Sequence, residues 1–207
     1  MDRVIILIDS NSLHNQIKRF IEKNFGIKDF KPDVDYEKLR DILANSRKLI
    51  RVYFYYPKLP AYFNSGDRQA QNKLIALLQS IDYFEVQEGR LQGHETFCKH
   101  CGKKTKHHEE KKVDVLITTT LLKMAYRDTS DVFVLLTSDA DFSPAVKAAK
   151  DTGKHIELVI MKGEEVWELK NVCDKITSLD HEVLKQFLKN YPSGQPTLTS
   201  TGATSIP

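Results

Sequence analysis

Short apolar runs alternate with amphipathic stretches along most of this 207-residue chain, and this alternation constrains its fold more than any other feature. Residues 4–8 form a continuous run rich in β-branched side chains, which is typical of a strand buried on both faces of a parallel sheet. Similar runs predict strands at residues 4–8, 49–56, 83–88, 132–136 and 156–160, with a candidate edge strand at 175–177.

Between these strands, apolar residues recur at helical spacing. The spacing predicts helices over residues 13–25, 36–43, 74–81, 113–124, 142–149, 164–169 and 181–188. The alternation predicts an α/β fold with an open, mostly parallel sheet and helices on both faces. We expect one domain over residues 1–190. Residues 191–207 contain no charged residue and many Pro, Gly, Ser and Thr, which predicts a disordered tail.

Composition excludes several classes of protein. With 41% hydrophobic and 29% charged residues, the chain is neither collagen-like nor wholly disordered. No apolar run approaches the roughly 18 residues of a membrane span, and the first one is too short for a signal peptide. The three cysteines form no disulfide framework, so we expect a reducing, cytoplasmic location. The net charge of +3 is too small to establish a polyanionic partner by itself.

Aspartates follow two of the predicted strands. Asp9 ends the first strand, whereas Asp139 and Asp141 follow the strand at 132–136; Asp114 opens a predicted helix. Because ligands of such sheets bind beyond the carboxyl ends of the strands, we expect these four acids to converge on one crevice. Clustered carboxylates repel one another unless a cation neutralises them, and Mg²⁺ or Mn²⁺ prefers oxygen ligands of this kind. Alternatively, an aspartate after a strand is simply the N-cap of the next helix.

Three motifs then resemble a known family. They are Ile-Asp-x-x-x-Leu after the first strand, Glu-Lys-Lys-Val-Asp-Val before the middle helix and Thr-Ser-Asp-Ala-Asp-Phe-Ser-Pro after the late strand. In this order and on strand–helix units they are similar to the NYN domains, the LabA-like members of the PIN-like nuclease superfamily. The resemblance covers residues 3 to about 178.

The resemblance implies a metal-dependent ribonuclease whose acidic cluster is Asp9, Asp114, Asp139 and Asp141. We expect Asp9 and Asp139 to be direct ligands of Mg²⁺ or Mn²⁺, and Asp114 and Asp141 to be direct or water-mediated ligands. The metal would supply the attacking hydroxide. Three polar residues would hydrogen-bond phosphate or water: Ser10, Asn11 and Ser138. The chain departs from the family at residues 118–120, where three threonines stand near the usual place of a further aspartate.

Residues 89–112 interrupt the strand–helix pattern with Gly, Cys, His and Lys. Cys98 and Cys101 have the Cys-x₂-Cys-Gly spacing of a zinc knuckle, and His94, His107 or His108 would complete a tetrahedral site. The alternative is a loop with incidental cysteines.

Candidate contacts with RNA lie in the same region and in the loop after the second strand. Residues 99–112 contain six lysines and two glutamates, so Lys103, Lys104 and Lys111 are candidates for phosphate contacts unless this is an ordinary solvated loop. Tyr62 and Arg68 are candidates for contacts with unpaired bases. We interpret Trp167 as a packing residue.

Three functions therefore compete. The first is a Mg²⁺- or Mn²⁺-dependent ribonuclease acting on RNA. The second is a catalytically weak or inactive RNA-binding or scaffold protein with the same fold. The third is an adhesion module of the von Willebrand A type, which ranks last because residues 9–13 depart from its Asp-x-Ser-x-Ser motif at two positions. A homo-oligomer is compatible with all three.

Overall fold

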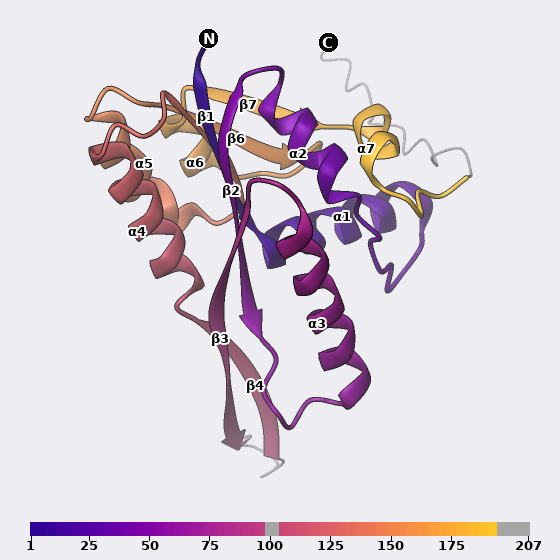
Figure 1. Cartoon of the computed structure of the whole chain (residues 1–207). Coiled ribbons are helices and arrows are strands. Elements are labelled where there is room, and N and C mark those ends of the chain that lie inside the picture. Colours follow the sequence, from indigo (N-terminus) through magenta and orange to yellow (C-terminus); the bar gives the residue numbers. More distant parts are fainter. Residues whose placement is uncertain (98–103, 194–207) are drawn as a thin grey trace, which may run out of the picture.

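A computed structural model of the chain describes residues 1–97 and 104–193 (Figure 1). Its centre is a seven-stranded sheet with the strand order β4-β3-β2-β1-β5-β6-β7, in which six strands are parallel and β4 is antiparallel to β3. The strands are β1 (Arg3–Asp9), β2 (Lys48–Lys58), β3 (Phe84–Phe97), β4 (Lys104–Lys111), β5 (Val132–Leu136), β6 (His155–Met161) and β7 (Lys175–Leu179). The predicted open, mostly parallel α/β fold is confirmed.

Helices cover both faces of this sheet (Figure 1). One layer contains α1 (Ser10–Phe25), α2 (Tyr36–Ala44), α3 (Ser65–Ser80) and α7 (His181–Phe187), and the other contains α4 (Val113–Tyr126), α5 (Ser143–Lys150) and α6 (Trp167–Val172). In β1, Val4, Ile6 and Ile8 pack toward the first layer, and Ile5 and Leu7 pack toward the second. Burial on both faces is the physical reason that this strand is apolar without alternation. Among the described residues, no helix is long and apolar enough to cross a membrane.

The strand order reverses at β1. The chain adds β2 and β3 on one side of β1, and then β5, β6 and β7 on the other. The connections that leave the carboxyl ends of β1 and β5 run to opposite faces of the sheet, since α1 belongs to the first layer and α5 to the second. A crevice between such diverging connections is the usual ligand site of an open parallel sheet.

The segment 89–112 differs from the sequence-based expectation. The predicted strand at 83–88 continues to Phe97, and β3 and β4 form an antiparallel hairpin from the pair Arg90 and Lys111 to the pair Phe97 and Lys104. The hairpin extends away from the helices of the second layer (Figure 1). Residues 89–97 contain few apolar side chains and no alternation, so hydropathy could not predict this extension.

Two further expectations were wrong. Trp167 is not a packing residue, because it lies at the start of α6 with 76% of its surface exposed. Tyr191 lies one residue beyond the predicted domain boundary, yet its hydroxyl is 2.6 Å from His181 Nδ1 and its ring packs edge-on against Phe25. The folded domain therefore includes Tyr191; the rest of the predicted tail, from residue 194, lies outside the described residues.

Candidate metal and RNA site

Asp9 and the loop after β5 meet at the point where the strand order reverses. Ile8 pairs with Leu136 in the parallel register of β1 and β5, so the next residues of the two strands are level. Thr137 Oγ1 donates to Asp9 Oδ2 over 3.4 Å. The two acidic segments predicted from the sequence are therefore adjacent.

Asp9 is buried, with 8% of its surface exposed. Its Oδ1 accepts hydrogen bonds from the backbone N–H groups of Asn11 (3.0 Å) and Ser12 (3.2 Å), so it is also the N-cap of α1. Burial raises the pKa of Asp9 to about 6, against the effect of these N–H groups, and the negative charge of Asp114 raises it further. The carboxylate is thus held in a fixed orientation, and among the described residues it forms no ion pair with Lys or Arg.

Asp139 resembles Asp9 in that one oxygen of its carboxylate caps a helix. Its Oδ1 accepts the N–H of Asp141 at 2.9 Å, which caps the short 3₁₀ helix η1 (Ala140–Phe142). The capping predicted as an alternative is therefore present at both Asp9 and Asp139. It occupies only Oδ1 in each case, and among the described residues Oδ2 of Asp139 has no hydrogen-bond partner.

Asp114 and Asp141 complete the acidic set from more exposed positions. Asp114 lies in the first turn of α4, and desolvation together with the charges of Asp139 and Asp141 raises its pKa. Close packing positions this helix end, since a Cβ at Gly89 would lie 2.3 Å from Val113 Cγ2. The residue before α4, Lys112, has a φ of 78°, a left-handed conformation that is strained for a non-glycine residue.

A buried hydrogen-bond network fixes the two acidic segments relative to each other. Ser12 Oγ accepts from Ser138 N–H (2.7 Å) and from Gln16 Nε2 (2.9 Å), and it lies 3.0 Å from Ser138 Oγ. Since it accepts twice, its own proton points to Ser138 Oγ. Gln16 Oε1 in turn accepts the N–H of Met161 on β6 at 2.8 Å. Ser12 and Gln16 were not among the predicted site residues; the detectable signal was two polar residues, four apart, on the apolar face of α1.

The donor set fits a hard divalent cation. It consists of carboxylate oxygens from four residues, two of which have pKa values raised by burial and by the negative charge of neighbouring acids. Within the described parts of the chain, none of the four forms an ion pair with Lys or Arg. The acids do not form a finished cage, because no three His, Cys, Asp or Glu side chains in residues 1–97 and 104–193 are close enough together to hold an ion.

The other predicted residues lie around this crevice and in the hairpin. Ser10 is buried and Asn11 half-buried at the start of α1. Tyr62 is 57% exposed in the β2–α3 loop, and Arg68 on α3 donates to the carbonyl of Phe63. Lys111 is exposed at the end of β4, and Lys104 begins that strand.

The predicted zinc ligands are only partly described. His94 of β3 pairs directly with His107 of β4, so both residues lie on the same face of the hairpin. Cys98, Cys101 and Lys103 lie outside the described residues.

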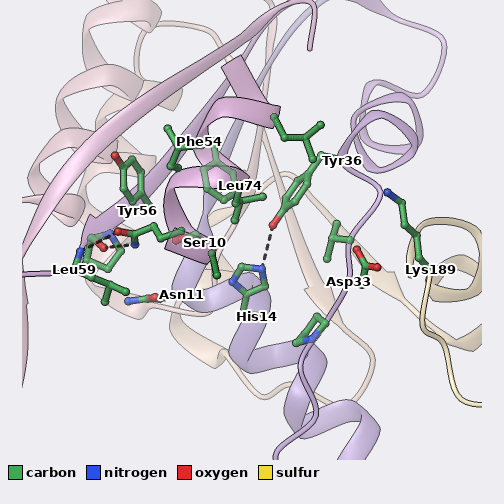
Figure 2. Close-up of a pocket in the computed structure, with 17 residues that line it drawn as sticks. Ser10, Asn11, His14, Asp33, Tyr36, Phe54, Tyr56, Leu59, Leu74 and Lys189 are labelled. Carbon is green, nitrogen blue, oxygen red and sulfur yellow. Dashed lines mark hydrogen bonds between the residues drawn. The ribbon is translucent and has the colours of Figure 1, made fainter. Parts of the chain in front are cut away.

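A cavity that the sequence did not predict is lined in part by Ser10 and Asn11 (Figure 2). It has a volume of about 410 Å³ and lies between α1, α2, α3 and β2. Its walls include Tyr36, Phe54, Tyr56 and Leu74, and His14 lies among them.

Comparison with known proteins agrees with this fold. No curated protein matches the chain. Among solved structures, it is similar to VPA0982, a protein of unknown function from Vibrio parahaemolyticus, with 17% sequence identity, a TM-score of 0.55 and coverage of 90% of this chain and 96% of that one. At this identity the likeness shows the fold alone. The sequence itself matches the NYN domain over residues 3–180. The chain therefore belongs to the NYN domain family of the PIN-like nuclease superfamily.

Proposed function

We propose that this protein is a ribonuclease that hydrolyses RNA phosphodiester bonds with Mg²⁺ or Mn²⁺ bound by Asp9, Asp114, Asp139 and Asp141. The observation that supports this most strongly is a set of four carboxylates at the reversal of the strand order, which have no cationic partner in the described part of the chain. Structural carboxylates are normally paired, whereas uncompensated ones with raised pKa values are typical of sites that bind a cation or catalyse a reaction.

Each acid has a distinct part in this proposal. Asp9 and Asp139 present Oδ2 to the ion while their Oδ1 atoms remain bound to backbone N–H groups. Asp114 and Asp141 contribute from the exposed side of the crevice, directly or through water. A bound divalent ion would supply a nucleophile from water and neutralise charge on the phosphate. Ser138, oriented by Ser12, lies where its hydroxyl can hydrogen-bond a phosphate oxygen or a water molecule.

Cationic residues beside the crevice would bind the RNA backbone. Lys58, Arg90 and Lys112 line a second cavity of about 400 Å³, between the end of β2, β3 and the start of α4. Lys112 lies two residues before Asp114, so a phosphate bound here would be close to the acids. Lys111 adds positive charge at the end of β4. Binding of RNA should accordingly weaken as the salt concentration rises.

A second candidate function is RNA binding without cleavage. Two observations favour it: the acids do not form a finished cage, and threonines occupy residues 118–120. Under this alternative the acids would cap helices and RNA would bind equally well with and without a divalent ion.

The decisive experiment is cleavage of a labelled single-stranded RNA by purified protein, in Mg²⁺ or Mn²⁺ and in chelator. Asp9→Asn and Asp139→Asn remove a ligand charge but retain an oxygen for the capping bonds, so folding should survive. We expect each to lose at least about a hundredfold in cleavage rate. Asp151→Asn, an exposed aspartate at the end of α5, is the matched control and should cleave normally. Equal cleavage in chelator, or full activity of both site variants, would refute the proposal.

We also propose a structural zinc site at the end of the hairpin, formed by Cys98, Cys101, His94 and His107. The direct pairing of the two histidines supports it. Reduced thiolates at such a site fit a cytoplasmic protein. Elemental analysis should find about one zinc per chain, and Cys98→Ser should release it. Protein prepared without chelator that contains no zinc would contradict the assignment.

A further inference from the structure

The cavity beside Ser10 and Asn11 is separate from the acidic site, but the first turn of α1 borders both. Asn11 lines the cavity, and its backbone N–H binds Asp9 Oδ1 at 3.0 Å. Ser10, Asn11 and His14 are spaced so that they lie on one side of the first turns of α1. A molecule in the cavity would therefore contact the same turn of helix that orients Asp9.

The walls of the cavity are mainly aromatic and aliphatic, and six polar or charged side chains interrupt them. Phe54 and Tyr56 of β2 and Leu74 of α3 form apolar surfaces, and the ring of Tyr36 packs edge-on against Phe54. Figure 2 shows His14 and Tyr36 side by side, joined by a 3.1 Å hydrogen bond between Nε2 and the phenol oxygen. A preformed cavity of this size and chemistry suits a flat, partly apolar ligand with a polar edge.

The cavity is held open by contacts that do not depend on a ligand. Gln71 of α3 donates to the carbonyl of Pro57 and accepts from the N–H of Leu59, both over 3.0 Å. These bonds fix the end of β2 against α3. The bond between His14 and Tyr36 fixes α2 against α1.

One polar side chain of the lining, His14, carries no charge. Burial lowers the pKa of His14 to about 4, with a further lowering by Lys18, so the imidazole is neutral at pH 7. A neutral imidazole has one donor and one acceptor nitrogen, and among the described residues its Nδ1 has no hydrogen-bond partner. The two charged residues of the lining, Asp33 and Lys189, come from the segment before α2 and the segment after α7. Such a lining does not match a phosphate, but it does match the edge of a base.

We propose that this cavity binds one unpaired nucleobase of single-stranded RNA, next to the phosphate that occupies the acidic site. The inference rests on the proposed function for the identity of its ligand. Its support is the aromatic and aliphatic walls, the neutral hydrogen-bonding edge at His14 and the shared turn of α1. RNA is read mainly through such unstacked bases, by stacking and by hydrogen bonds to their edges.

The test measures binding without cleavage. A fluorescent decamer of single-stranded RNA is titrated with the protein in chelator, and a series of decamers carries one abasic nucleotide at each position in turn. We expect one position at which the abasic nucleotide weakens wild-type binding on the order of tenfold, as for the loss of one stacked base. The neighbouring positions should change much less.

Two alanines of α3 provide matched variants. Ala70 is exposed and lines the cavity, so Ala70→Trp should block it without disturbing the core. Ala76 is exposed on the same helix and does not line the cavity, so Ala76→Trp is the control. We expect Ala70→Trp to bind the intact decamer as weakly as the wild type binds the sensitive abasic one, and to lose its own abasic sensitivity. Ala76→Trp should behave as the wild type, and melting curves should show all three proteins folded.

The outcomes separate the two proposals. A wild type that binds all abasic decamers equally well overturns the base subsite, whatever its nuclease activity. Equal weakening by Ala70→Trp and Ala76→Trp also overturns it. A position-specific abasic effect that only Ala70→Trp removes supports the subsite, even if the Asp9→Asn and Asp139→Asn tests refute cleavage.

Discussion

The two ends of the central strands use aspartate in opposite ways. At the amino ends, Arg3 binds Asp131 through two side-chain bonds of 2.7 and 3.1 Å, and the backbone N–H of Arg3 adds a third of 2.8 Å. Asp174 likewise binds Lys150 Nζ at 2.7 Å and the N–H of Ile156 at 2.8 Å. At the carboxyl ends, Asp9 and Asp139 bind backbone N–H groups but no cation among the described residues.

The pKa values follow this difference. The hydrogen bonds between Asp131 and Arg3 hold the pKa of Asp131 well below the usual range. Burial and neighbouring acids instead raise the pKa values of Asp9 and Asp114. Arg and Lys side chains thus neutralise the aspartates at the amino ends of the strands. Among the described residues, no such side chain neutralises those at the carboxyl ends. Aspartates at the amino ends stabilise the fold, and those at the carboxyl ends are available to a ligand.

The largest difference between aspartates at the two ends should appear in the rate of RNA cleavage. We expect Asp114→Asn to lower the rate of RNA cleavage by about a hundredfold or more, because a ligand charge is lost. Asp131→Asn should leave that rate within about twofold, because its partners lie at the opposite ends of the strands. Cleavage assays with saturating Mn²⁺ measure both. A comparable loss in Asp131→Asn would show that the contrast between the two ends is not functional.

Stabilisation of the protein by metal should depend on the aspartates at the carboxyl ends of the strands. Wild-type protein at a Mn²⁺ concentration of 100 times its Kd should gain about 2.7 kcal/mol in free energy of unfolding. In Asp139→Asn this gain should shrink, and the metal-free variant should be at least as stable as the wild type because one repelling charge is gone. Melting curves with chelator and with Mn²⁺ provide the measurement. An identical metal-induced shift in both proteins would reduce Asp139 to its capping role.

At the amino ends of the strands, the contribution of Asp131 to the free energy of unfolding should depend on pH. Since the folded pKa of Asp131 is lowered, its stabilisation is present above the unfolded value near pH 4 and is lost as the pH falls through the folded value. Asp131→Asn should therefore cost about 1 kcal/mol at pH 7, allowing for solvent screening of this half-exposed pair. Urea unfolding at pH 7 and at about pH 2 should show the difference from wild type narrowing at the lower pH, because the folded pKa of Asp131 lies well below the usual range. A constant difference would mean that the charge of Asp131 contributes nothing.

The smallest expected effect concerns the backbone beside Asp114. Lys112 has a φ of 78° and no side-chain capping bond, so glycine suits its position better. Lys112→Gly should raise the free energy of unfolding by about 0.5 kcal/mol. The same variant should weaken RNA binding, since a cation near the acids is lost. Urea unfolding and RNA titration measure the two effects; a loss of stability would show that the left-handed backbone is not strained.

The sequence by itself determined the parallel sheet and the positions of Asp9 and Asp139. Both follow from local patterns: strands buried on two faces must be apolar throughout, and a polar residue directly after such a strand must lie at its carboxyl end. Asp114 could be predicted because it follows a basic stretch and opens a helix. The family motifs coincide with these same segments.

Only the tertiary structure decided the remaining features. The bond between Ser12 and Ser138 joins residues 126 positions apart, and Tyr36 meets His14 because α2 packs beside α1. The cavity exists only because α1, α2, β2 and α3 pack together around it. Trp167 is exposed, and β3 extends to Phe97 by pairing with β4; hydropathy predicts neither feature. Periodicity shows which face of an element is apolar, but packing alone shows which other element meets that face.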